Sequence, residues 1–469
     1  MRNFNNIERL SGSKSSENAL GLDKPDHASG FQVLAVIALV MAVLFTTQSF
    51  NFLFAEPGQE GLAVSTSVRS SPVYGVFVLS MVALVGFLFV VHLLTRRLSA
   101  RLWIGIGIIA YVIGSAFWSV DASATLVSGA ILSFQIVAAY VLAVYLTPAS
   151  FVRTLFYITV FIVLASFVAL ILVPELVNEP RPDGWIAESQ FRGIVGTKNR
   201  VAMLFTATVM MSILIGPLRV PLFWRTLMVI LALIGIALSS AATAVVALLL
   251  VTMLSLWMKY VRVLALEIAF AVAVVYLLLI LLLPFIDFSQ FDLFSLLGRD
   301  PGLTGRDQLW ALAVHYFKQR PLLGYGYYGF FSPTPYSPVW SFWDNFRYFF
   351  TVKFHNSAAD VAVHLGLVGI AIFASVCFGA FLVVFNRTID VTSRCILIML
   401  LHVSLVDSMT NFVIFYHNSS ANLIVFYALF AAGVRYDDTF VGQRRSAQAG
   451  EAASRDAKVR NRLAPPARA

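Results

Sequence analysis

The stretch FHNSAADVAVHLGLVG, Phe354–Gly369, carries a His-Asn pair where a polar, aromatic-rich segment gives way to a long apolar run. That run, Ala358–Phe385, exceeds the roughly 20 residues that cross a bilayer, so it predicts a membrane-spanning helix. An ionisable imidazole at the edge of such a helix is unusual and needs a reason. A helix-capping or interfacial histidine is one interpretation of His355. A reactive residue is the one we favour.

The composition places most of the chain in lipid. Of its 469 residues, 59% are hydrophobic and 12% are charged, which is too apolar for a soluble protein. Runs long enough to span a bilayer recur along the sequence, so we predict an all-α polytopic membrane protein of about twelve transmembrane helices. The predicted spans are 31–54, 73–94, 102–120, 126–146, 151–173, 201–216, 226–239, 241–257, 263–286, 358–385, 395–416 and 421–434.

Basic residues in the short loops predict the orientation. They fall on one side of the membrane if both termini are cytoplasmic, and this parity requires a break near Ser239-Ser240. The first run, 31–54, is too long for the apolar core of a cleavable signal peptide, so we expect an uncleaved span. The predicted segments are a disordered cytoplasmic tail (1–30), transmembrane helices 1–9 (31–286), a periplasmic loop (287–354), transmembrane helices 10–12 (355–434) and a basic cytoplasmic tail (435–469).

Two outer loops depart from this charge rule. Segments 174–200 and 287–354 both carry several Arg and Lys residues on the outer side. Long loops cross the membrane regardless of charge, which is one explanation. The other is that outward-facing cations gather where an anion is held, and the near absence of Lys and Arg from the short outer loops favours it.

The longer loop contains a predicted helix. Thr304 reads as its N-cap, and Leu309, Trp310 and Phe317 recur at helical spacing, which predicts an amphipathic helix at the bilayer or across a cavity mouth. Arg306 lies in its first turn, where the helix N-terminus also favours a phosphate. The aromatic residues that follow fit either an interfacial belt or platforms for sugar rings.

Other polar and sulfur-containing residues receive structural interpretations. Cys377 and Cys395 lie in apolar runs and read as small core residues. Asp407 shares a helical face with Ser404, Ser408 and Asn411, and we favour interhelical hydrogen bonds with Asp407 paired to an arginine. No cluster of His, Asp and Glu with metal-ligand spacing appears, so neither a metal nor another cofactor is predicted.

Three motifs resemble those of the O-antigen ligase and polysaccharide polymerase superfamily of bacterial envelope glycan assembly. His355-Asn356, followed after nine residues by Gly366-x-x-Gly369, matches the ligase signature. The other two motifs are Arg192…Gly196…Asn199 before a span and Thr304-Gly305-Arg306…Trp310 in the long loop. The resemblance covers roughly Phe191–Gly369.

The resemblance implies a metal-independent, inverting glycosyltransferase of the bacterial inner membrane, with its active site facing the periplasm. Its donor is a glycan on undecaprenyl diphosphate, and its acceptor is a sugar hydroxyl of another glycan or of lipid A core. Other envelope glycan-assembly proteins are possible partners, and nucleic acid is not. An exopolysaccharide or O-antigen polymerase is the reading we favour. A lipopolysaccharide ligase, and a transporter or flippase of lipid-linked glycans, are the alternatives.

Within that scheme each candidate residue has an expected role. An imidazole suits the general base, and planar guanidinium groups suit the diphosphate. Asn199 and Asn356 fit either sugar hydroxyls or helix ends, and the two glycines suit close helix packing. We therefore assign His355, Arg306 and Arg192 as catalytic, Lys198, Asn199, Arg200, Asn356 and Trp310 as substrate-binding, and Gly366 and Gly369 as structural.

Overall fold

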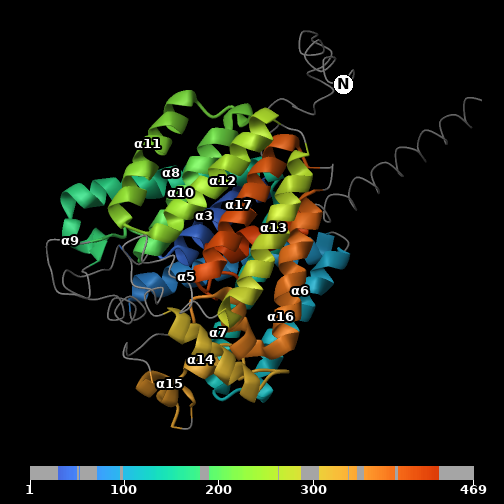
Figure 1. The fold of residues 1–469 in the computed structure, drawn as a ribbon. Coiled ribbons are helices and arrows are strands. Elements are labelled where there is room, and N and C mark those ends of the chain that lie inside the picture. Colours follow the sequence, from blue (N-terminus) through green and yellow to red (C-terminus); the bar gives the residue numbers. More distant parts are fainter. Residues whose placement is uncertain are drawn as a thin grey trace, which may run out of the picture.

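The computed structural model describes residues 30–49, 52, 71–95, 99–179, 190–261, 264–286, 306–335, 337–345, 353–385 and 389–431. In these ranges the structure is almost wholly helical, and the one sheet pairs two short strands, β1 (Asn178–Glu179) and β2 (Gln190–Phe191). Figure 1 shows long helices packed side by side, with α14 (Arg306–Gln319) and α15 (Val339–Asn345) gathered at one end. We call this the loop end of the bundle.

Nine helices of the described ranges are long and apolar enough to cross a membrane, some with a short 3-10 or π turn at their end. The prediction of an all-α polytopic membrane protein is confirmed, while the total of twelve spans stays a prediction. The bundle consists of α3 (Gly30–Thr46), α5 (Pro72–Thr95), α6 (Ala100–Gly114), α7 (Ala122–Tyr145), α8 (Pro148–Leu172), α10 (Lys198–Leu214), α11 (Leu222–Ser239), α12 (Ala242–Leu256), α13 (Ala265–Leu282), α16 (Ser357–Val384), α17 (Val391–Thr410) and Ser420–Ala431. The short helix α9 (Pro174–Val177) precedes β1.

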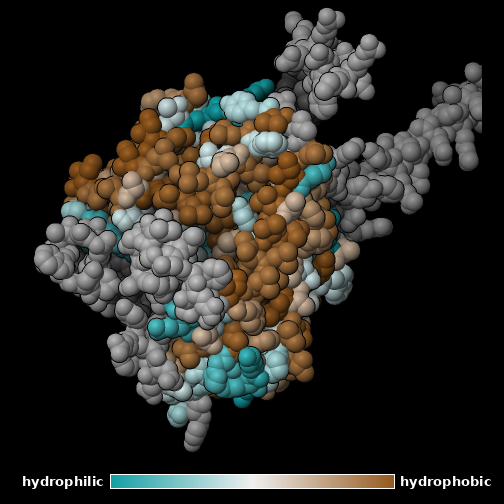
Figure 2. All heavy atoms as spheres, viewed as in Figure 1, coloured by the Kyte–Doolittle hydropathy of each residue, from teal (hydrophilic) through white to brown (hydrophobic). Residues whose placement is uncertain are grey.

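The outer surface of the bundle is apolar. Leu79, Phe223 and Met253 each expose more than 60% of their surface. Figure 2 shows such residues as a broad hydrophobic surface between more hydrophilic ends. An exposed apolar surface of this extent is compatible with lipid as the surrounding solvent.

Polar residues begin several of these helices. Asp121 accepts hydrogen bonds from two backbone N–H groups of α7, Thr147 caps α8, and Thr197 caps α10. Asp390 does the same for α17. Each cap satisfies N–H groups that have no partner inside the helix, which matters most where water is scarce.

The break predicted near Ser239-Ser240 is confirmed. Helix α11 ends at Ser239, Ser240 adopts a left-handed conformation with φ of 52°, and α12 begins at Ala242. The hydroxyl of Ser239 donates to the carbonyl of Ile236, so the last turn is satisfied locally. Two helices therefore replace one overlong span.

Two predicted spans end earlier than expected. Helix α3 stops at Thr46 rather than near residue 54, because Gln48 turns the chain with φ of 62°. Helix α17 stops at Thr410 rather than Tyr416, and Asn411 is extended. The Asn411 side chain donates to Asp407, the type of local bond by which asparagine competes with helical backbone pairing. Apolar content alone did not predict these turns, and both border the site described below.

The predicted amphipathic helix in the long loop is confirmed as α14. Its Thr304 N-cap lies outside the described residues. Leu309, Ala313 and Tyr316 of α14 join a second hydrophobic cluster at the loop end, separate from the main core. Its other buried members are Tyr325, Phe330, Phe331, Val339, Phe342, Phe354, Ala359 and Val363. Many of the loop's aromatic residues therefore form a core.

Gly366 interrupts α16 with φ of 65° and ψ of −159°, a conformation that side chains disfavour. A Cβ atom here would lie 2.3 Å from the backbone carbonyl carbon of Leu322. The break leaves backbone groups that the loop satisfies: Tyr325 donates its N–H to Val363, and Leu367 donates to Pro321. The close packing predicted for this glycine is thus made with a loop. Gly369 lies within the same helix, where a Cβ would meet Leu365.

Candidate functional site

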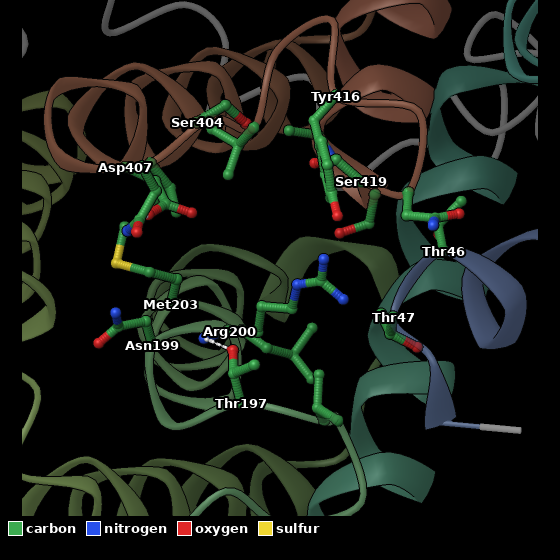
Figure 3. Close-up of a pocket in the computed structure, with 18 of the residues that line it drawn as sticks. Thr46, Thr47, Thr197, Asn199, Arg200, Met203, Ser404, Asp407, Tyr416 and Ser419 are labelled. Carbon is green, nitrogen blue, oxygen red and sulfur yellow. Dashed lines mark hydrogen bonds between the residues drawn. The ribbon is translucent and has the colours of Figure 1, made fainter. Parts of the chain in front are cut away.

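A cavity of about 340 Å³ opens between the end of α3, the start of α10, the end of α17 and the chain that follows α17 (Figure 3). Its apolar lining includes Leu204, Leu400 and Val403. Its polar wall is made by Thr46, Thr47, Thr197, Lys198, Asn199, Arg200, Lys353, His355, Ser404, Asp407, Asn411, Tyr416, Asn418, Ser419 and Ser420. Segments far apart in sequence therefore meet at one site.

His355 lies at this cavity in a left-handed backbone conformation with φ of 57°, just before the N-cap of α16. Its Nδ1 atom is 3.4 Å from Oδ1 of Asn411. Nδ2 of Asn411 donates to Oδ1 of Asp407 at 2.7 Å, so the amide oxygen faces the imidazole. An amide oxygen only accepts, and this contact therefore requires the proton on Nδ1 and leaves the lone pair on Nε2.

The surroundings of His355 favour its neutral form. Burial lowers the pKa of His355 well below its usual value of about 6.5, and the charges of Lys353 and Arg306 lower it further, against the opposing effect of Asn411. The lone pair of Nε2 is therefore available at neutral pH.

Arg200 and Lys353 are two of the three cations that line the cavity with His355, the third being Lys198. Arg200 is labelled at the centre of Figure 3, and its guanidinium lies 5.6 Å from the centre of the Tyr416 ring. Its Nη1 atom is buried without a hydrogen-bond partner among the described residues. Lys353 has a pKa lowered to about 8, chiefly by burial and by the nearby charge of Arg200, while Asp360 and Asp407 oppose the shift. Such a pair offers charge and donors to an anion.

Neither Arg306 nor Trp310 lines the cavity. Arg306 opens α14, and its charge contributes to the lowered pKa values of both His355 and Lys353, which places it within electrostatic reach of both. Trp310 is buried in α14, with 3% of its surface exposed. Its position fits a role in packing the helix that carries Arg306.

The basic loop before α10 divides its predicted residues between two tasks. Lys198, Asn199 and Arg200 line the cavity, and Nζ of Lys198 also donates to Oε1 of Gln190. Arg192 does not line it: its Nε and Nη2 atoms donate to the carbonyl of Leu176 at 3.2 and 3.1 Å. The structure thus separates Arg192 from the other residues of this motif.

Asn356 caps a helix instead of facing the cavity. Its Oδ1 accepts from the N–H of Ala359, and its Nδ2 donates to the carbonyls of Ile280 and Met409. The residue is fully buried. Of the two readings left open for Asn356, helix capping fits these contacts, and the cap also fixes the backbone beside His355.

Asp407, Asn411 and Lys353 also line the cavity, and the sequence patterns did not predict them as site residues. We expected Asp407 to pair with an arginine, but its carboxylate accepts a hydrogen bond from Asn411. One sequence signal could have indicated Asp407 and Asn411: an acidic residue stands four positions before an asparagine at the end of an apolar run. Among the described residues, no group of three His, Cys, Asp or Glu side chains lies close enough to hold a metal.

Residues 227–374 match the family model described as O-antigen ligase. The match spans about a third of the chain, includes His355 and α14, and confirms the resemblance drawn from the motifs. It supports glycan transfer of the ligase or polymerase type by a multi-pass membrane protein. No curated protein and no solved structure matches the chain.

Proposed function

We propose that this protein is an inverting glycosyltransferase that moves a glycan from undecaprenyl diphosphate to a sugar hydroxyl. The observation that carries the proposal is one cavity that brings His355, with its Nε2 lone pair available, together with Arg200 and Lys353. A transferase of this kind needs a base for the acceptor and cations for the leaving group. The match to the O-antigen ligase family supports the same chemistry.

The cations bind the donor diphosphate in this mechanism. Arg200 offers a planar fork of N–H donors, and Lys353 adds a second positive charge on the same cavity. As the bond between the anomeric carbon and the phosphate oxygen breaks, negative charge grows on the departing diphosphate. Cations already in position stabilise that charge in the transition state more than in the bound donor.

His355 accepts the proton of the acceptor. The acceptor oxygen attacks the anomeric carbon while Nε2 of His355 takes the hydroxyl proton, and the diphosphate leaves as an anion. A single displacement of this kind inverts the anomeric centre. The resulting imidazolium keeps its Nδ1–H directed at Asn411, whose amide orientation is fixed by Asp407. Asn411 and Asp407 are therefore positioning residues.

The remaining predicted residues act around this centre. We assign Arg192 to holding the loop before α10, because its donors bind the Leu176 carbonyl. Arg306 contributes long-range positive charge from the start of α14. Lys198 and Asn199 line the cavity and support the diphosphate and the glycan.

The proposed location is the bacterial inner membrane, with the loop end facing the periplasm and both termini in the cytoplasm. Basic residues support this orientation. At the C-terminal end of α10, away from the cavity, Arg225 donates to the carbonyl of Ser212 and Lys259 donates to that of Ile213. Such an excess of cations marks the cytoplasmic side of many membrane proteins.

The acceptor distinguishes a polymerase from a ligase. In exopolysaccharide or O-antigen polymerisation the acceptor is another lipid-linked glycan, and in ligation it is lipid A core. Both use the same base and the same diphosphate site. Because the matching family model is described as O-antigen ligase, ligation to lipid A core stays as the alternative to polymerisation.

The test is a complementation experiment in a deletion strain with glycans resolved by size. We expect His355→Ala and Arg200→Ala to abolish transferred or extended glycan while single lipid-linked glycans accumulate in the outer leaflet. His315→Ala is the matched control, because His315 is exposed on α14 and does not line the cavity. Normal product from His355→Ala would refute the general base, and accumulation in the inner leaflet would indicate a flippase. Loss of the polymer ladder identifies another lipid-linked glycan as the acceptor, and loss of glycan-capped lipid A core identifies lipid A core as the acceptor.

A further inference from the structure

One side of the cavity is built from hydroxyl and amide groups that the mechanism above does not use. Thr46 and Thr47 come from the end of α3, and Asn418, Ser419 and Ser420 from the chain before and at the start of the last helix. We call these five residues the hydroxyl wall. Figure 3 shows Thr46, Thr47 and Ser419 on one side of Arg200, and Asp407 and Asn199 on the other.

The threonines of the wall present acceptors. Oγ1 of Thr46 donates to the carbonyl of Ala42 at 2.8 Å, and Oγ1 of Thr47 donates to the carbonyl of Val43 at 2.7 Å. Each hydroxyl has one hydrogen, and it is used in these bonds. The lone pairs therefore remain, and Oγ1 of Thr47 lies 2.8 Å from Oγ of Ser49.

Ser419 presents a donor beside them. Its Oγ accepts from the N–H of Ala421 at 3.2 Å, and its own hydrogen has no partner among the described residues. The amide of Asn418 adds both a donor and an acceptor to the same wall. The wall thus offers both kinds of group and carries no charge.

This pattern suits a neutral sugar better than an anion. A phosphate oxygen accepts hydrogen bonds only, so it can pair with the donors of the wall but not with the threonine lone pairs. A sugar hydroxyl donates and accepts, and it pairs with both kinds of group. We propose that the hydroxyl wall is a binding site for the hydroxyl groups of a neutral sugar ring, next to the diphosphate site at Arg200. This inference rests on the proposed function and adds the class of glycan that the cavity recognises.

The test uses the purified full chain in nanodiscs and two probes. One is the neutral oligosaccharide released by mild acid from the lipid-linked glycans of the same cells, and the other is inorganic pyrophosphate. Thr47→Val removes the hydroxyl and keeps the shape of the side chain, and Ser419→Ala removes the donor. Thr206→Val is the matched control, because Thr206 makes the same type of backbone bond inside α10 and does not line the cavity.

We expect each wall variant to weaken oligosaccharide binding about fivefold, the effect of one lost hydrogen bond, and to leave pyrophosphate binding within about twofold. Thr206→Val leaves both unchanged. If the oligosaccharide still binds in the presence of saturating undecaprenyl diphosphate, the hydroxyl wall holds the acceptor glycan. If undecaprenyl diphosphate competes with the oligosaccharide, the wall holds the donor glycan.

Three results would overturn the proposal: no oligosaccharide binding by the wild type, equal binding by Thr47→Val and wild type, or a loss confined to pyrophosphate. Failure of the proposed function gives a different pattern. In that case pyrophosphate and undecaprenyl diphosphate do not bind, and His355→Ala leaves the glycans of the cell normal.

Discussion

Replacing Lys353 by arginine tests whether this side chain binds the donor as a cation. Its pKa is lowered to about 8, chiefly by burial, so about nine-tenths of it is protonated at pH 7 and about one-tenth at pH 9. A charge-assisted hydrogen bond to phosphate is worth roughly 1.5–3 kcal/mol, which is tenfold or more in affinity. Donor use by the wild type therefore falls about tenfold between pH 7 and pH 9.

Arginine keeps its charge throughout this range, because its pKa exceeds 12. We expect Lys353→Arg to remove the alkaline decline, and Lys353→Met to lower donor use at pH 7 toward the wild-type level at pH 9. The assay is the release of undecaprenyl diphosphate from lipid-linked glycan by the protein in nanodiscs. It is run at low donor concentration, so that kcat/KM reports the pKa values of the free enzyme. An alkaline decline unchanged in Lys353→Arg would refute the assignment.

Three further predictions concern the imidazole, its partner and the break in α16. Because burial and nearby cations lower the pKa of His355, kcat/KM rises with pH through a midpoint below 6.5; a midpoint above 7 in a pH profile contradicts this. Asn411→Ala removes the 3.4 Å contact that fixes the tautomer, and a long hydrogen bond of about 1 kcal/mol predicts a roughly fivefold fall in kcat with little change in pyrophosphate binding. Gly366→Ala places a Cβ atom against Leu322 at a residue with positive φ. We expect it to lower the free energy of unfolding by about 1–3 kcal/mol, measured by thermal unfolding. Gly86→Ala, at a helical glycine with no atom within 4 Å of the added Cβ, is its control and is expected to keep wild-type stability.

Patterns in the sequence predicted most of the fold. Apolar runs predicted the long helices, and the charge parity of the loops correctly predicted the break at Ser239-Ser240. Helical spacing predicted α14. These features depend on the local order of residues, which is what a single sequence contains.

The end of α17 was predicted poorly because it depends on side-chain bonds that hydropathy does not report. Asn411 leaves the helix while its side chain binds Asp407, and Ser357 of α16 donates to the Asn411 carbonyl. That contact joins residues 54 positions apart. Tertiary contacts of this kind decide where an apolar run stops being helical.

The candidate site was predicted in part for the same reason. His355, Lys198, Asn199 and Arg200 were selected from local motifs, and all four line the cavity. Arg192 carries the same charge, but the direction of its side chain is set by the Leu176 carbonyl, which the motif does not contain. The hydroxyl wall joins the end of α3 to residues almost four hundred positions later, so no local pattern indicates it.

The most direct test of the proposed chemistry compares wild type, His355→Gln and His315→Ala as purified proteins with a lipid-linked glycan donor. General-base catalysis contributes typically 10²–10⁴-fold, so we expect His355→Gln to release undecaprenyl diphosphate at least about 100 times more slowly. Its pyrophosphate binding stays within about twofold of the wild type, and His315→Ala keeps the wild-type rate. Release by His355→Gln at the wild-type rate would contradict the claim that His355 takes the proton.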